Sequence, residues 1–373
     1  MADTVSKHID MTTGSLWRNI PLFAFPVAAT SILEQLSNLI ATVIIGNFSG
    51  DQGTLAMAAV GSNVPLTSLM LNLFIGMSLG SNVVIANAIG RNDQNMVKRA
   101  VHTSILMALV GFVVIALGEI FAEPMLAALN VPAETMPLAS LYLRVFLLSM
   151  PSILLYNFEA AIFRSVGITR MPLQALAVST VLNIGLDLIF VPVLHWGVAG
   201  VAIATAIAYT VSAATLFIRL LKTDSVVRVT PRDLAIDPVA LKRIVKIGLP
   251  AGIQSAVFAV ANIIIQSAIN SLGTEVMAAS SAAMSLEYVC YNLLNSFSQA
   301  CTTFVGQNHG ARQIDRCTKT LKACLVEGGI VALTTIIVIV GLGARDLVAV
   351  QQRSQHRLDR LYPRVLDLPG VRL

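Results

Sequence analysis

Residues 20–46 read IPLFAFPVAATSILEQLSNLIATVIIG, an apolar run whose one charged side chain is Glu34. A helix needs roughly 20 apolar residues to cross the hydrocarbon core of a bilayer, and this run is long enough. The rest of the chain has the same character: 55% of its 373 residues are hydrophobic, 12% are charged, and the mean hydropathy is +0.76. Such a composition excludes a water-soluble globular protein.

Further runs of this kind follow, and they are continuous rather than short and alternating, which predicts helices and not barrel strands. The second and eighth runs contain small and polar residues and are expected to be tilted or kinked. The predicted fold is an all-α polytopic membrane protein with about nine transmembrane helices, at residues 20–46, 55–89, 101–121, 136–158, 173–193, 198–221, 244–271, 276–305 and 323–343.

Lysine and arginine are segregated to one side of these helices. They occur in every second connection, from Lys7 and Arg18 before the first helix to residues 312–322 before the ninth, whereas the intervening loops carry acidic residues. Basic loops are retained on the cytoplasmic side. This pattern predicts a cytoplasmic amino terminus in a multi-pass protein of the plasma (cytoplasmic, inner) membrane. The net charge of +5 then reflects topology, and no nucleic-acid partner is expected.

Residues that carry chemistry are sparse. The four cysteines show no CxxC spacing, the five histidines are scattered, and the sequence has no Gly-rich phosphate loop and no Ser, His and Asp pattern. We therefore expect no enzymatic activity, no catalytic residue and no cofactor, and no metal site can be assembled. An intramembrane enzyme would need polar residues that converge at one depth, and beyond Asn183, Asp187 and Glu34 the sequence offers none.

The chain contains an internal repeat that preserves Pro, Asn and Gly as well as apolar residues. Chance alignment of apolar helices does not favour such matches. The two copies are offset by 220–224 residues, a length that contains six predicted helices. Both copies therefore begin on the same side of the membrane and are parallel repeats about an axis along the membrane normal. With a shift of 220, Met57 falls on Met277, Leu66 on Leu286, Asn72 on Asn292, Asn87 on Gln307 and Gly90 on Gly310; with a shift of 224, Pro26 falls on Pro250 and Asn38 on Asn262.

The repeat predicts a domain organisation. A six-helix lobe spans residues 1–222 and begins with a cytoplasmic tail at 1–15; a basic cytoplasmic linker at 223–242 leads to a second lobe at 243–343. The second lobe has three of six expected helices and is predicted to be incomplete. Residues 344–373 contain six Arg and no Lys, on the side that carries no other basic loop. We interpret this tail as read out of frame or as following a truncating lesion; the alternative is a genuine, disordered external tail.

Several local strings resemble those of the multidrug and toxic compound extrusion (MATE) transporters. They include VAATSILEQLSNLIATVIIG, NAIGRNDQNMVKRA, FRSVGITRMPLQ, LNIGLDLIFVPVLHWGVAGVAIATAIA, GLPAGIQSAVFAVANIIIQSAINSLG and GQNHGAR, and the resemblance covers roughly residues 15–343. It implies two six-helix lobes that form a V, alternating access to a central cavity, and expulsion of amphipathic organic cations in exchange for H⁺ or Na⁺. A monomer is expected, with small organic cations and membrane lipid as its partners.

An ion-coupled exchanger needs a carboxylate inside the membrane, where an uncompensated charge is costly. Asp187 lies well inside the fifth predicted helix, and Asn183 is one turn away on the same face. Together they provide hard oxygen ligands suited to Na⁺ or a proton. The alternative for Asp187 is a structural residue, hydrogen-bonded between helices.

The resemblance adds residues to this site and also shows a departure from it. The family's amino-terminal cation site has this Asn and Asp pair, with a Thr eighteen residues further on, which corresponds to Thr205. It also has an Asp in the first helix where this chain has Ala41. Glu34 is two turns earlier, about 10 Å along the helix axis, and is the candidate replacement for the missing charge. The alternative for Glu34 is a carboxylate that takes no part in coupling.

Glu287, in the eighth predicted helix, matches a position where related members often carry Glu, and we predict that it binds the cationic substrate; the alternative is a charge satisfied by water near the outer surface. Two other functions remain open. A lipid-linked saccharide flippase would need basic residues in the central cavity, where the predicted helices have almost none. The other is an inactive remnant of an exporter. The identity of the drug and the choice between Na⁺ and H⁺ are left open.

Overall fold

The computed structural model describes residues 8–48, 53–129, 131–270, 274–338 and 341, and within them the regular structure is helical. The elements are α1 (Leu16–Phe48), α2 (Gly53–Gly90), α3 (Gln94–Met107), α4 (Val110–Ala128), α5 (Met136–Leu147), α6 (Met150–Ser165), α7 (Arg170–Phe190), α8 (Gly197–Lys222), the 3₁₀ turn η2 (Pro231–Asp233), α9 (Pro238–Asn270) and α10 (Thr274–Gly310). A last helix spans Ile314–Val338. The tail predicted at residues 344–373 lies outside the described residues.

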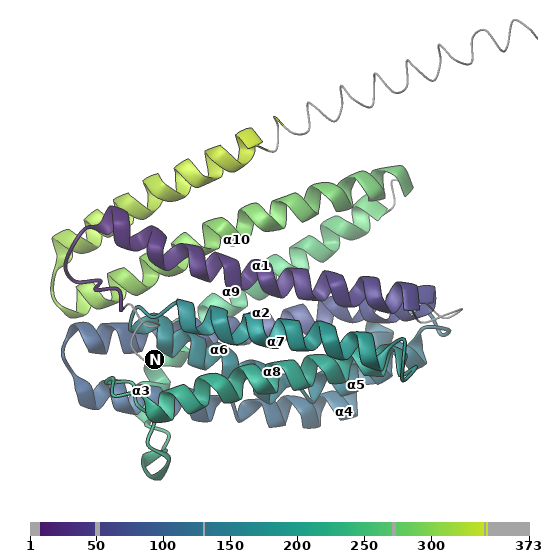
Figure 1. Cartoon of the computed structure of the whole chain (residues 1–373), viewed down its shortest axis with the longest axis horizontal. Helices are drawn as coiled ribbons and strands as arrows, with labels where there is room; N and C mark the ends of the chain where they lie inside the picture. The colour runs from purple at the N-terminus through teal and green to yellow at the C-terminus, as the bar shows by residue number, and fades with distance from the viewer. Residues whose placement is uncertain (1–7, 49–52, 130, 271–273, 339–340, 342–373) are drawn as a thin grey trace, which may run out of the picture.

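The described parts of the predicted membrane spans fall on helices (Figure 1), and the ends of the spans predicted at 244–271 and 323–343 lie outside the described residues. Among the described residues, seven helices are long and apolar enough to cross a bilayer, and α5 with α6 brings the number to eight if that pair is one span. The eighth predicted span is the helix α10, which is more polar and does not meet this criterion. Outward-facing side chains such as Val181, 73% exposed, are themselves apolar. This surface is suited to lipid, and the chain is a multi-pass membrane protein.

Two of the predicted spans are interrupted, which the sequence reading did not anticipate. The span predicted at 101–121 is divided between α3 and α4, and the span at 136–158 is divided between α5 and α6, which meet at an angle of 46°. A proline explains the second break, because Pro151 in the first turn of α6 has no N–H to donate to the preceding turn.

The turns that end α2 and α10 show the internal repeat, because they have equivalent backbone conformations and hydrogen bonds. Asn92 and Arg312, which are 220 residues apart, both have a left-handed backbone, with φ of 56° and 59°. The backbone hydrogen bonds around them are also equivalent: Arg91 N to Asn87 O at 3.1 Å and Ala311 N to Gln307 O at 2.9 Å, then Asp93 N to Ala88 O at 3.0 Å and Gln313 N to Asn308 O at 2.9 Å.

The two copies touch each other at the same positions. A Cβ atom on Gly90 would overlap the carbonyl of Gln307, and a Cβ on Gly310 would overlap the carbonyl of Asn87. Each contact is the other one shifted by 220 residues, so α2 and α10 cross symmetrically, as the two halves of an isologous interface do. This geometry is the one expected of parallel repeats about an axis along the membrane normal.

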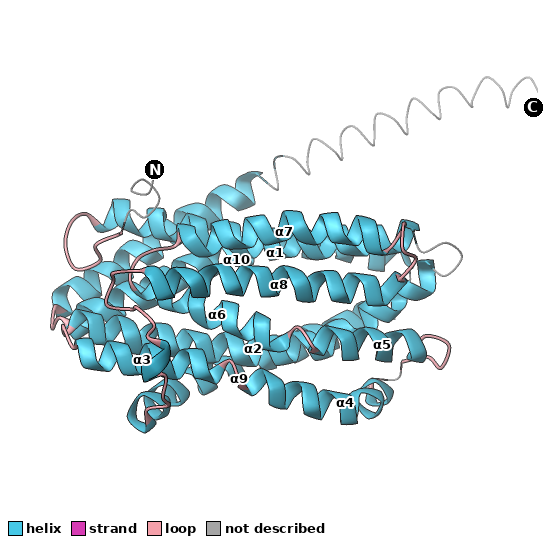
Figure 2. Cartoon of the chain, turned by 60° about the horizontal axis from the view of Figure 1, so that its bottom comes forward, coloured by secondary structure: helices cyan, strands magenta, loops and turns pink. Residues whose placement is uncertain are grey.

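Glycines also allow α2 to pack closely along α9 (Figure 2). The backbone of Gly76 faces that of Gly252, and the backbone of Gly80 faces that of Gly248, with no room for a side chain between them. Close helix packing through small residues is typical of membrane proteins. A polar bond joins α2 to α10 instead, because Thr303 donates to Asn82 at 2.9 Å.

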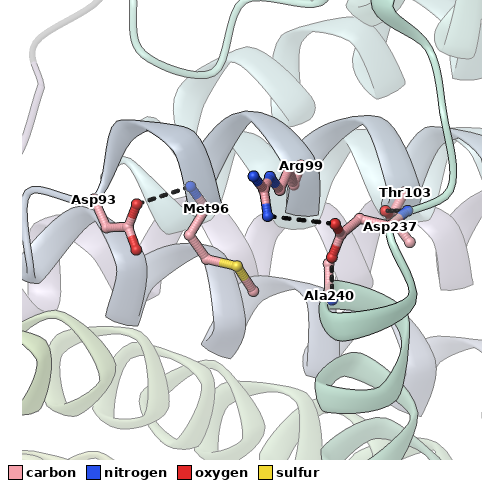
Figure 3. A network of polar contacts seen from close by, with 6 residues as sticks. All are labelled: Asp93, Met96, Arg99, Thr103, Asp237 and Ala240. Carbon is pink, nitrogen blue, oxygen red and sulfur yellow. Dashed lines mark hydrogen bonds and ion pairs between the residues drawn. The ribbon is translucent and has the colours of Figure 1, made fainter.

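The segment between α8 and α9 is held against α3 (Figure 3). Asp237 caps α9 by accepting a hydrogen bond from Ala240 N at 2.7 Å, its own N–H donates to Thr103 at 3.0 Å, and its carboxylate lies 3.6 Å from Arg99. α9 therefore begins at Pro238, inside the segment predicted as a linker at 223–242.

The residues before α1 are also anchored. Asp10 accepts hydrogen bonds from Thr12 and Thr13, and these bonds lower the pKa of its carboxyl group to about 2. Further along, Met11 is fully buried, and Arg316 donates to the carbonyl of Thr13 at 2.7 Å. The predicted cytoplasmic tail at 1–15 thus packs, from Met11 on, against the second copy of the repeat.

Candidate ion site between α1, α7 and α8

Three helices of the first repeat enclose a small polar cavity. Its volume is about 30 Å³, which is the space of one water molecule or one bare ion. An organic drug cannot enter a space of this size. The lining residues are Glu34, Ser37 and Asn38 from α1, Leu176, Ser179, Thr180 and Asn183 from α7, and Thr205, Ala208 and Tyr209 from α8.

One hydrogen bond joins α1 to α7 across this cavity. Ser37 donates to Asn183 Oδ1 at 3.0 Å, while Asn183 Nδ2 has no partner among the described residues. A buried amide N–H without a protein partner is free to donate to a further oxygen.

Asp187 is one turn beyond Asn183 on α7 and is not part of the cavity lining. Its exposed fraction is 0%, and neither carboxylate oxygen has a hydrogen-bond partner among the described residues. An ionised carboxylate in such surroundings is strongly disfavoured. The side chain is therefore stable there either as the neutral acid or with a cation beside it.

The register between α1 and α7 relates the predicted residues to one another. Both helices run in the same direction (Figure 1), since Ile9 N donates to Gly167 O at 3.4 Å at one end and Ser37 meets Asn183 further along. One turn beyond that bond, Ala41 on α1 is level with Asp187 on α7. The carboxylate that this chain lacks at Ala41 would therefore stand beside Asp187.

The structure gathers most of the predicted coupling residues and separates one residue from them. Glu34, Asn183 and Thr205 line the same cavity, and Asp187 follows on the next turn of α7. Glu287, the predicted substrate residue, is exposed on α10, outside this cavity. Among the described residues, no group of three or more His, Cys, Asp or Glu could hold a metal ion.

Glu159 is a buried acid that was not predicted from the sequence. It lies on α6 with an exposed fraction of 0%, and both of its oxygens are without partners among the described residues. The span predicted at 136–158 ended one residue before it. The signal that was available is the apolar sequence on both sides of Glu159, which continues to Phe163.

Comparison with known proteins identifies what this chain resembles. A family model described as MatE matches residues 26–189 and 250–348. The probable multidrug resistance protein YoeA of Bacillus subtilis is 28% identical over 340 residues, which are 87% of this chain and 71% of that protein. The multidrug export protein MepA of Staphylococcus aureus is 23% identical over 86% of this chain and 70% of its own length.

Other relatives and solved structures extend this comparison. The FAD transporter of Shewanella oneidensis is 25% identical over 80% of this chain and 69% of its own length. A multidrug resistance MATE family transporter in an outward-facing conformation has the same fold, with a TM-score of 0.83 at 22% identity over 93% of this chain and 77% of that one. A transporter of the same superfamily from Pyrococcus furiosus has a TM-score of 0.82 at 23% identity, over 90% of this chain and 74% of its own.

Proposed function

The chain belongs to the MatE family of membrane transporters, and on that premise we propose that it is a secondary active exporter of amphipathic organic cations in exchange for H⁺ or Na⁺. Membership of a transporter family agrees with the expectation that the chain is not an enzyme. We propose that the chain acts as a monomer in the cytoplasmic membrane and that its amino terminus lies in the cytoplasm.

The observation that carries this proposal is the cavity between α1, α7 and α8. Its volume of about 30 Å³ suits one small ion and excludes a drug, so ion and drug would occupy different places. Glu34 supplies a carboxylate at the cavity and Asp187 supplies one beside it, on the next turn of α7, while Asn183 and Thr205 supply neutral oxygens. Hard oxygens of this kind bind Na⁺ or carry a proton.

The substrate class rests on the relatives and on Glu287. The Bacillus and Staphylococcus relatives carry multidrug names, and Glu287 is an exposed acid on α10 that would attract an organic cation. Binding of the ion at Asp187 and of the drug between the repeats must be coupled, because an exchanger that changed conformation with neither or both of them bound would let the ion cross without exporting a drug.

The test is transport by the purified 373-residue chain in liposomes, with ethidium as the organic cation and imposed Na⁺ or pH gradients. We expect gradient-dependent ethidium movement that is lost in Asp187→Asn and kept in the control variant Glu123→Gln. Glu123 is an exposed carboxylate near the end of α4 that lies 3.2 Å from Arg144. Comparing the two gradients separates Na⁺ from H⁺ coupling.

Two results would contradict the proposal. Ethidium movement that is unaffected by Asp187→Asn would remove this residue from coupling. Movement of FAD but not of ethidium would assign the chain to the substrate class that names the Shewanella relative.

A further inference from the structure

A stripe of polar side chains on α10 faces the first repeat. Gln299, Thr303 and Gln307 follow one another at intervals of four residues, so they lie along one side of this helix. Thr303 and Gln307 are buried, with exposed fractions of 1% and 4%. A polar group that is buried between the helices of a membrane protein needs a hydrogen-bond partner.

The three residues of this stripe find their partners across the boundary between the repeats. α10 belongs to the second repeat, and the partners belong to α2 and α6 of the first. We call the three bonds the polar ladder; they join the repeats at the end of the molecule where α2 and α10 end. The bonds are Arg164 to Gln299 at 2.9 Å, Thr303 to Asn82 Oδ1 at 2.9 Å, and Gln307 to the carbonyl of Ser165 at 2.7 Å.

The middle bond of the ladder can be exchanged for one inside α10. The Thr303 hydroxyl group lies 2.9 Å from Asn82 Oδ1, across the boundary, and 2.8 Å from the carbonyl oxygen of Gln299, in its own helix. A hydroxyl group has one proton to donate. When the repeats move apart, this proton can be donated to Gln299, while Asn82 keeps its own bond to Ala161 O at 3.1 Å. Neither helix has to unfold for the bond between the repeats to break.

The crossing beside the ladder is also formed by polar backbone. Gly90 lies against the carbonyl of Gln307, and Gly310 lies against the carbonyl of Asn87, with no room for a side chain at either contact. Hydrogen bonds that water can replace contribute little net free energy, whereas the burial of apolar surface is lost when an interface opens. An interface of this composition is therefore suited to repeated opening.

From this arrangement we propose that the polar ladder is the gate between the repeats at this end and that Thr303 is its switch. With this end closed, Thr303 donates to Asn82. With this end open, Thr303 donates to Gln299 of its own helix, and water hydrates Asn82. The proposal rests on the proposed exchange function in one respect, since an exchanger with alternating access needs this end to open during its cycle.

The test measures the distance between the repeats at this end by double electron–electron resonance of the purified chain in detergent. Spin labels are placed at Gln94 and Ile314, which are exposed, lie 220 residues apart and begin α3 and the last helix. The four native cysteines are replaced by alanine. Thr303→Val keeps the shape of the side chain but leaves the buried Asn82 Oδ1 without a donor when this end is closed. The population of long distances should therefore rise at least about fivefold.

Three variants are compared with Thr303→Val. Thr303→Ser keeps the hydroxyl group and should restore the wild-type distances. Thr302→Val makes the same change one residue earlier, where the hydroxyl group donates to Ser298 O of the same helix at 2.8 Å, and should leave the distances unchanged. Gln307→Met removes the donor to the carbonyl of Ser165, a second bond of the ladder, and should shift the distances in the same direction as Thr303→Val.

The proposal is overturned if Thr303→Val and Thr302→Val give the same distances, or if Thr303→Ser does not restore those of wild type. Should Thr303→Val fail to fold, unchanged distances in Gln307→Met would overturn it independently. The measurement uses no gradient and no substrate, so a failure of the gate is distinguishable from a failure of the proposed function, which the ethidium assay tests.

Discussion

Replacing Asp187 with leucine should make the folded chain more stable, although it removes the group to which we assign ion coupling. Asp187 has an exposed fraction of 0%, and neither of its oxygens has a partner among the described residues. A buried polar group without partners costs about 1–3 kcal/mol, and an apolar residue of similar size avoids this cost. We therefore expect Asp187→Leu to raise the free energy of unfolding by about that amount.

The same variant should lose its response to the coupling ion. An ion that binds only the folded state stabilises it by about 2.7 kcal/mol at a concentration 100 times its dissociation constant. Thermal unfolding in detergent is measured in NaCl and in KCl of equal ionic strength, and at several pH values. Wild type should gain stability with Na⁺ or with acid, whereas Asp187→Leu should respond to neither.

The control is Glu123→Gln, which removes an exposed carboxylate that is paired with Arg144. Exposed ion pairs contribute about 0–1 kcal/mol, so this variant should remain close to wild type and keep the ion response. If Asp187→Leu instead lowers stability by more than about 1 kcal/mol, the carboxylate has a hydrogen-bonding role between helices. The assignment of Asp187 as the coupling group would then be wrong.

Three further outcomes follow from the packing and charges described above. Gly76→Leu should destabilise the chain by at least about 2 kcal/mol in thermal unfolding, because the backbone of α9 occupies the space where the new side chain would lie; an unchanged melting temperature would contradict the close contact. Ala41→Asp places a second carboxylate level with Asp187 and should strengthen Na⁺-dependent stabilisation roughly tenfold in apparent affinity, since opposite charges attract strongly at low dielectric; weaker stabilisation would show that the register is wrong. Hydrogen bonds from Thr13 and Thr12 lower the pKa of the Asp10 carboxyl group from 3.8 to about 2, so the stability that this group gives to the amino-terminal segment is present above about pH 4 and is lost as the pH falls towards 2. Hydrogen exchange of residues 9–14 in wild type should therefore rise as the pH falls over that interval. In Asp10→Asn the exchange, after correction for its intrinsic rate, should be fast at every pH in this window.

The repeat could be predicted from sequence because its positions permit so few residue types. Gly90 and Gly310 recur because a side chain at either would overlap the backbone of the partner helix. Asn87 and Gln307 recur as amides at this crossing: Asn87 donates to Gly306 O at 3.3 Å and Gln307 donates to Ser165 O at 2.7 Å. Apolar residues alone carry no such information, since any of them packs against lipid or another helix.

The candidate ion site was predictable only in part. Asn183 and Asp187 are four residues apart on one helix, and this local spacing can be read from the sequence. That Ser37 bonds Asn183, and that Glu34 shares the cavity, depends on how α1 is placed beside α7. Hydropathy does not contain this register, because sliding one apolar helix along another leaves the composition of both unchanged. Glu159 was missed for a related reason, since a span boundary fixed to within a few residues decides whether an acid is buried.

The position of α1 determines how an event in the small cavity can reach the interface between the repeats. Its second half carries Glu34 and Ser37 and contacts α7, within the first repeat. Its first half packs on the second repeat, in a buried cluster shared by α1, α10 and the last helix. In this cluster the rings of Phe23 and Phe304 lie edge to face, with their centroids 5.8 Å apart. Among the described helices, α1 is thus a continuous element that touches both the ion site and the opposite repeat. A change in charge at Glu34 that shifts α1 along α7 therefore acts on the same helix that carries the Phe23 contact, and Pro26, which lies between the two residues and has no N–H to donate, is the point at which this helix can bend.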